Sequence, residues 1–181
     1  MKKMRILLSV LICLSLTFSM AVNAQADEKV SISQTLTQLP NNRWRTVRVK
    51  EYYDEELGCV VTETTEVITN NRLKSKSGSG TYKNTKEFTW DNNTSKSSYY
   101  AQGYFKWGNG EVSVSSPTGN INNLPANATI EDSNISSGTG KYGFVFNKYA
   151  YVTYSCTVKT VVGIKHDLSV SIRISENGNL I

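Results

Sequence analysis

The chain has 181 residues, with 20 lysines and arginines against 15 acidic residues and a formal net charge of +5. Three of these cations lie in the first five residues, so the rest of the chain is close to neutral and lacks the basic excess typical of nucleic-acid-binding proteins. The chain has one histidine, which excludes zinc sites built on several histidines and leaves little room for histidine-dependent catalysis.

The N-terminal segment has the layout of a secretory signal peptide. Basic residues are followed by a mostly apolar run over 6–20, and small-x-small cleavage motifs end at Ala24 and Ala26. The apolar run is shorter than the roughly 20 residues that a membrane-spanning helix needs. We therefore predict a signal peptide over 1–26, cleaved near Ala24 or Ala26, and a single secreted domain over 27–181 with no membrane span.

The first third of this domain alternates β-prone runs with turn signals. The runs at 44–53 and 59–69 are rich in Val, Thr and Ile, which favour strands. Residues 54–58 end in Gly58 and are predicted to be the hairpin loop between them. The polar segment 72–85 allows two interpretations: a flexible loop, or a solvent-facing edge strand whose lysines protect it from aggregation.

The middle of the chain predicts a strand pair with an aromatic first strand. Residues 86–90 predict a short strand that ends in a turn at 91–93. Residues 97–107 and 111–115 predict a hairpin joined by Gly108-Asn109-Gly110, because Asn and Gly accept positive φ. Alternation of side chains along 97–107 places Phe105 and Trp107 on the side predicted to face the core and Tyr100 and Tyr104 on the exposed side.

The last third contains the clearest pattern in the sequence. Residues 117–126 predict a loop, 128–135 a strand, and 136–140 a break. Residues 149–175 predict a long antiparallel hairpin, in which apolar residues alternate with Ser, Thr, Lys and Arg. The single histidine, His166, falls in the turn predicted at 163–167, where it is expected to be solvated.

Short strands with Gly and Asn turns, and no helical periodicity beyond the leader, predict an all-β fold. We expect an antiparallel β-sandwich, with a β-barrel as the alternative. Two cysteines, Cys59 and Cys156, remain once the leader is removed, and an even pair in an exported chain predicts one disulfide.

The sequence predicts no catalytic residues, cofactor or metal site. The acidic cluster of Asp54, Glu55 and Glu56 is interpreted as a solvated loop. The candidate ligand contacts are Tyr100, Tyr104 and Asn109, because aromatic faces beside amide groups suit sugars and also anchor protein interfaces.

Three features of the sequence can be compared with known groups of proteins: the leader, a body rich in Asn, Lys, Ser and Thr, and the C-terminal strand pair. In these features the chain resembles small secreted all-β proteins of low-GC Gram-positive bacteria. The resemblance rests on no specific motif and implies no role for any residue. We expect a secreted, non-enzymatic binding or interaction module whose partner is a glycan, a surface polymer or a protein, and not nucleic acid. The alternatives are a small secreted enzyme or enzyme inhibitor, and a membrane-active β toxin.

Overall fold

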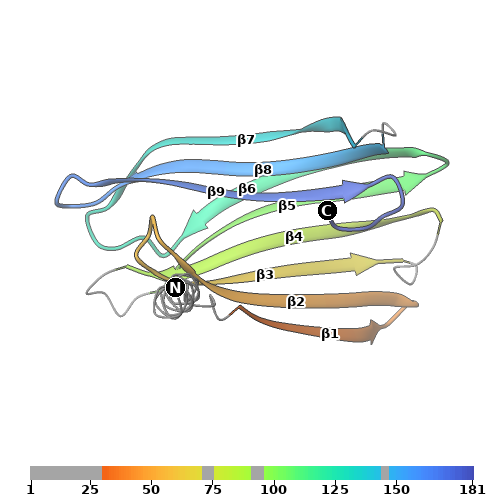
Figure 1. Ribbon diagram of the computed structural model, residues 1–181, viewed down its shortest axis with the longest axis horizontal. Coiled ribbons are helices and arrows are strands. Elements are labelled where there is room, and N and C mark those ends of the chain that lie inside the picture. The colour runs from red at the N-terminus through yellow and green to blue at the C-terminus, as the bar shows by residue number, and fades with distance from the viewer. Residues whose placement is uncertain (1–29, 71–75, 91–95, 144–146) are drawn as a thin grey trace, which may run out of the picture.

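The computed structural model describes residues 30–70, 76–90, 96–143 and 147–181, so the predicted signal peptide and the predicted turn at 91–93 lie outside it. The described residues form an all-β structure of two antiparallel sheets, neither of which closes on itself (Figure 1). The strands are β1 (Ser31–Leu39), β2 (Arg43–Asp54), β3 (Cys59–Thr69), β4 (Gly78–Thr89), β5 (Lys96–Gly108), β6 (Glu111–Asn122), β7 (Thr129–Tyr142), β8 (Asn147–Lys159) and β9 (Lys165–Ser175). This confirms the predicted sandwich.

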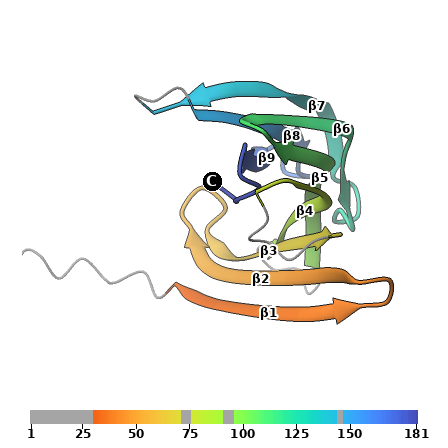
Figure 2. The same cartoon turned by 90° about the vertical axis from the view of Figure 1, so that its right-hand side faces the viewer.

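The two sheets differ in size, and the smaller one covers only part of the larger. The large sheet has the order β1-β2-β3-β4-β5-β6, and the small sheet has the order β7-β8-β9. Strand β8 packs over β5 and β6, and β9 packs over β4 and β5. Strands β1 to β3 therefore extend beyond the small sheet, and Figure 2 shows them on the side of the molecule opposite β7.

The core lies between the two sheets and follows the two-residue period of the strands. Alternate residues of β5 and of β8 are buried, which confirms the parity predicted for both. Each large apolar side chain removed from water stabilises the fold by about 1.5–3 kcal/mol. The buried set is Val61, Val67, Tyr82, Phe88, Tyr99, Ala101, Phe105, Trp107, Val112, Ile121, Ala150, Val152, Tyr154, Cys156, Val158, Leu168, Val170, Ile172 and Ile174.

Glycines of β4 and β5 make room for the largest rings of this core. Gly78 lies directly opposite Trp107. A Cβ on Gly78 would come within 2.7 Å of the indole ring. Tyr82 packs edge-to-face against Phe105 with ring centroids 5.3 Å apart. Residues 72–75 lie outside the described residues, but over the rest of 72–85 both interpretations are wrong, because β4 is neither a loop nor an edge but a strand hydrogen-bonded on both sides.

Two other segments predicted to be irregular are also strands. Strand β6 continues through most of the predicted loop at 117–126, and a bulge opposite Gln102 and Tyr104 accommodates Pro117 at this sheet edge. Strand β7 runs through the predicted break at 136–140, where the rings of β8 tyrosines lie over the glycines. In β7 the cross-strand tyrosines fill the space that the glycines leave, and in β6 Tyr154 of the small sheet lies against Gly119.

The predicted disulfide between Cys59 and Cys156 is wrong, since the two residues are not bonded to each other in the structure. Cys59 begins β3, whereas Cys156 lies in β8, which packs over β5 and β6. Strand β3 is two strands away from β5, about 10 Å along the sheet, and packed sheets lie about 10 Å apart. A disulfide needs Cα atoms within roughly 7 Å of each other.

We expect Trp107→Ala to reduce the free energy of unfolding by about 3–5 kcal/mol, because it empties a buried site between β4, β5 and the turn at Gly178. Tyr104→Ala on the opposite face of the same strand should cost about 1 kcal/mol or less. Urea unfolding followed by circular dichroism gives both values. Equal losses for the two variants would show that the faces of β5 are assigned the wrong way round.

We expect the melting temperature of the protein to be the same with and without a reducing agent, because Cys59 and Cys156 are not cross-linked to each other. Cys156→Ser should lower it under both conditions, since a hydroxyl would replace a buried thiol. Calorimetry on matched samples measures these changes. A melting temperature that falls only in the reductant would mean that the two cysteines pair in solution.

Candidate functional site

The single histidine and the Cys156 thiol both lie in packed positions. His166 lies in β9, not in a turn, and its ring packs edge-to-face against Trp90 with centroids 5.0 Å apart. Burial raises the pKa of the Cys156 thiol, which keeps it protonated and unreactive. The described residues hold no group of three His, Cys, Asp or Glu side chains that could bind a metal ion.

The predicted contact residues occupy two separate places. Tyr100 and Tyr104 lie half-buried on the outer face of the large sheet, as their parity predicts. The Lys83 ammonium lies 4.4 Å from the centre of the Tyr100 ring and covers part of that face. Asn109 is in the hairpin turn, five residues and about 17 Å of strand beyond Tyr104. The structure therefore does not bring Asn109 together with the tyrosines, and their role in binding stays a prediction.

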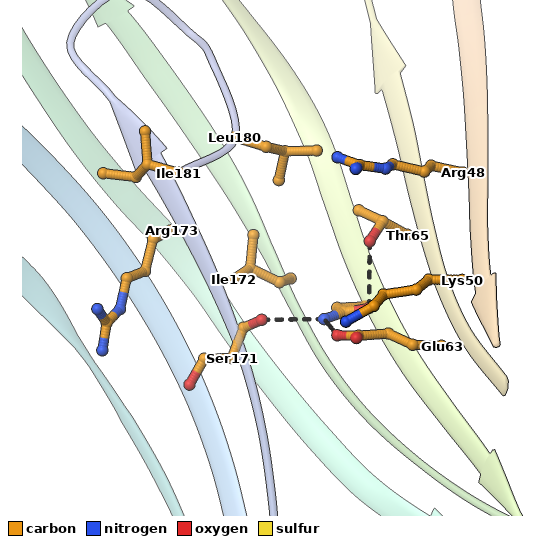
Figure 3. Close-up of a pocket in the computed structure, with 10 residues that line it drawn as sticks. Arg48, Lys50, Glu63, Thr65, Ser171, Ile172, Arg173, Leu180 and Ile181 are labelled. Atoms are coloured by element: carbon orange, nitrogen blue, oxygen red, sulfur yellow. Dashed lines mark hydrogen bonds between the residues drawn. The ribbon is translucent and has the colours of Figure 1, made fainter. Parts of the chain in front are cut away.

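A groove runs along the inner face of the large sheet where the small sheet stops. It consists of two adjoining hollows, each of about 280 Å³, which share Arg48, Thr65 and Leu180 as lining residues. We call these two hollows together the groove. Its floor comes from β1 to β4, and its wall comes from β9 and the segment after it (Figure 3).

The floor of the groove is polar because β2 and β3 carry polar residues on their inner faces. Arg48 pairs with Thr65 in the strand register, and Lys50 pairs with Glu63. In an inner-facing position covered by a second sheet these charged residues would lose their hydration, so their presence fits the incomplete cover over β2 and β3. The sequence contains this signal, since period-two alternation places Arg48 and Lys50 on the same face as the buried Thr46.

Asn84 of β4 ties the floor of the groove to its wall. Its amide nitrogen donates to Glu63 Oε1 at 2.6 Å and to the Ser171 carbonyl oxygen of β9 at 3.1 Å. Its amide oxygen accepts from the Thr65 hydroxyl at 3.3 Å. The Asn84 side chain is buried, so these bonds hold the two sheets at a fixed distance here.

The carboxylate of the groove has a hydrogen-bond donor from the protein, whereas its cations outnumber it. Glu63 already accepts the short bond from Asn84, whereas Arg48 forms no ion pair with a described residue. The Lys50 ammonium lies 4.6 Å from the centre of the Tyr52 ring. Arg173 lies on the rim, with its guanidinium carbon 5.8 Å from the Tyr149 ring centre. Arg48 and Lys50 thus line the first hollow with one acidic side chain, Glu63, whereas the Arg173 guanidinium points away from them (Figure 3), and this excess of cations favours an anionic ligand.

The wall of the groove is a turn in which the chain folds back along β9. The Ser175 amide donates to the Asn179 carbonyl at 2.9 Å, and the Ile181 amide donates to the Arg173 carbonyl at 3.1 Å. Gly178 takes a φ of +77° in this turn and lies against the Trp107 ring. The Tyr82 hydroxyl donates to the Gly178 carbonyl oxygen at 3.1 Å, which fixes the turn to the large sheet.

The second hollow contains a buried polar atom that the protein does not satisfy. Thr46 is 6% exposed, and its hydroxyl oxygen has no hydrogen-bond partner. Thr46 lines the hollow together with Gln34 and Arg48. An unpaired buried hydroxyl costs about 1–3 kcal/mol, so a ligand group that bonds to it gains a corresponding advantage.

No protein-family model, no curated protein and no solved structure matches the chain. Among the residues that the structure describes, no helix is long and apolar enough to span a membrane.

We expect Tyr82→Phe to lower the free energy of unfolding by about 1–3 kcal/mol, because it leaves the Gly178 carbonyl without its donor. It should also speed amide exchange at Asn179 and Ile181, whose bonds hold the wall of the groove. Hydrogen exchange read by NMR measures this. Tyr100→Phe on the outer face is the control, and equal acceleration by both variants would contradict the anchoring role of Tyr82.

Proposed function

We propose that this chain is a secreted, non-enzymatic binding protein for an acidic glycan or a similar anionic surface polymer, which it holds in the groove. The observation that carries the proposal is that, among the described residues, a cation without an ion pair lies in the same hollow as a buried hydroxyl without a hydrogen bond. Arg48 and the buried Thr46 hydroxyl line the same hollow. An anionic polymer rich in hydroxyl groups supplies partners for both.

The polar groups along the groove suit a sugar acid in particular. Guanidinium and ammonium groups bind carboxylates or phosphates through charge-assisted hydrogen bonds. Gln34, Thr65 and Ser171 add the amide and hydroxyl groups that sugar hydroxyls need. The two adjoining hollows of the groove lie between a sheet face and a turn, and together they would hold a stretch of such a chain.

Tyrosines at the rim extend this surface. The rings of Tyr149 and Tyr151 lie over Gly140 and Gly138 on the outer face of the small sheet, with centroids 6.1 Å apart. Arg173 connects them to the groove, because it lines the first hollow and contacts the Tyr149 ring. Aromatic rings lying on a sheet offer a stacking surface to sugar rings. A polymer leaving the groove past Arg173 would meet them.

The secreted location is supported by the leader-like N-terminal sequence, which has basic, apolar and small-residue parts in the order of a signal peptide. Anionic polymers are exposed outside the cell, where such a protein would meet them. The only histidine of the sequence, His166, packs against Trp90, and the Cys156 thiol is buried, which favours binding over hydrolysis.

The proposal is tested by titrating the purified protein with polygalacturonate and, as an uncharged comparison, with dextran. Isothermal titration calorimetry should show binding to polygalacturonate that weakens as salt rises, and no binding to dextran. Arg48→Gln should weaken binding by about tenfold or more, since a hydrogen bond to a charged group contributes about 1.5–3 kcal/mol.

Arg43→Gln is the matched control, because it removes the same charge from the exposed outer face of the same strand. It should change the affinity less than about twofold, in line with a surface charge away from the ligand. Equal loss in both variants would indicate non-specific attraction to net charge. Equal binding to dextran and polygalacturonate would rule out an anion-selective groove.

A further inference from the structure

Strand β1 is a sheet edge without the usual protection. It is the end strand of the large sheet, and its partner on one side is β2. The strand Ser31–Leu39 contains no charged residue, no proline and no glycine, and its register with β2 has no bulge. Eight of its nine residues are exposed, so it offers an open row of backbone hydrogen-bonding groups.

The other three edges of the described sheets are each blocked. Strand β6 carries Pro117 and a bulge, and β7 and β8 pack against it. Strand β7 has a bulge after Ile130, beside which Glu131 forms ion pairs with Lys159 at 3.5 Å and Lys165 at 2.5 Å. Strand β9 is covered near its end by the turn that pairs Leu180 with Ile174. Edge protection is thus present at three edges and missing from β1.

The side chains of β1 also lack a partner on the inner face. Ile32 and Leu36 point to the inner side of the sheet, where they are 57% and 46% exposed. They lie beyond the reach of the small sheet, and both views place β1 at the end of the molecule farthest from β7 (Figures 1 and 2). Approach of another strand to this edge is therefore unobstructed by the described residues.

We propose that β1 pairs with the β1 of a second copy of this chain, antiparallel and about a two-fold axis at Gln34. This register places Ile32 opposite Leu36 of the partner subunit on the inner face, and Ser33 opposite Thr35 of the partner subunit on the outer face. Antiparallel partners share a face, so apolar residues meet apolar residues and hydroxyls meet hydroxyls. The two large sheets become one continuous sheet.

A second copy fits this edge better than a charged or irregular segment does. The strand pairs with itself without opposing like charges, because it has none. A two-fold interface uses the same surface of both copies, and the alternation of β1 is compatible with its own reversal about Gln34. The nine residues span about 30 Å of strand, which allows a long ladder of backbone hydrogen bonds.

Pairing through β1 would place both grooves on the same face of the joined sheet. Each groove begins at Gln34 and Arg48, on the strands nearest to the two-fold axis. The pairing of β1 does not depend on what the groove binds, so the proposed dimer and the proposed ligand are tested separately.

The test is the oligomeric state of the purified protein, measured by sedimentation velocity over micromolar concentrations. The parent should sediment as a dimer at the upper end of this range. The double variant S33K/T35K should sediment as a monomer, because the proposed register brings the two introduced lysines of one copy opposite those of the other. Circular dichroism should show the same fold for parent and variant, since both positions are exposed on the outer face.

The matched control is S33K/T35E, which introduces charges at the same two positions. In the proposed register the new lysine of each copy lies opposite the new glutamate of the other, so this variant should remain a dimer. A parent that is monomeric at all these concentrations, or S33K/T35K that remains dimeric, would overturn the proposal. A monomeric S33K/T35E would overturn the register about Gln34.

Discussion

The structure depends on the contact between large aromatic rings and glycine backbones. Trp107 lies over Gly78 within its own sheet and against Gly178 of the turn after β9. Its neighbour Tyr82 packs against Phe105 and donates to the Gly178 carbonyl. The same rings therefore fill the core, fix the spacing of β4 and β5, and hold the turn that walls the groove. A side chain at any of these glycines would separate elements that the groove requires to be close.

Because the small sheet covers only part of the large sheet, the inner face of the large sheet has an apolar region and a polar region. Under β8 and β9 the inner face is apolar and buried, whereas beyond β9 the same face presents Arg48, Lys50 and Glu63. Charged groups are costly in a dry core but remain hydrated at its margin. The boundary between these regions is crossed by Asn84, which is buried and bonds to both sheets. The polar site therefore begins where the hydrophobic contact between the sheets ends.

Alternation along single strands could be predicted from the sequence, whereas contacts between distant strands could not. The faces of β5 and the β8–β9 hairpin were predicted because the period of two is a local property. The stretch at 136–140 was wrongly predicted to be a break, and 78–80 to be part of a loop or an edge strand, because the rings that lie against their glycines come from Trp107, Tyr149 and Tyr151. The prediction of a disulfide was wrong because the number of cysteines carries no information on which strands the small sheet covers. For the same reason the groove could not be located, although the residues of its floor alternate plainly in β2.

The order of the strands has a consequence for how the chain folds. Neighbours in each sheet are also neighbours in the sequence, and the chain passes from one sheet to the other only between β6 and β7 within the described residues. In sandwiches that interleave their strands, distant segments must meet before a sheet can form, and this slows folding. Here each sheet can assemble from successive hairpins with short loops to close, and the long-range step is the docking of one finished sheet on the other. A β-sandwich with this strand order should fold faster than its size and all-β content alone would suggest.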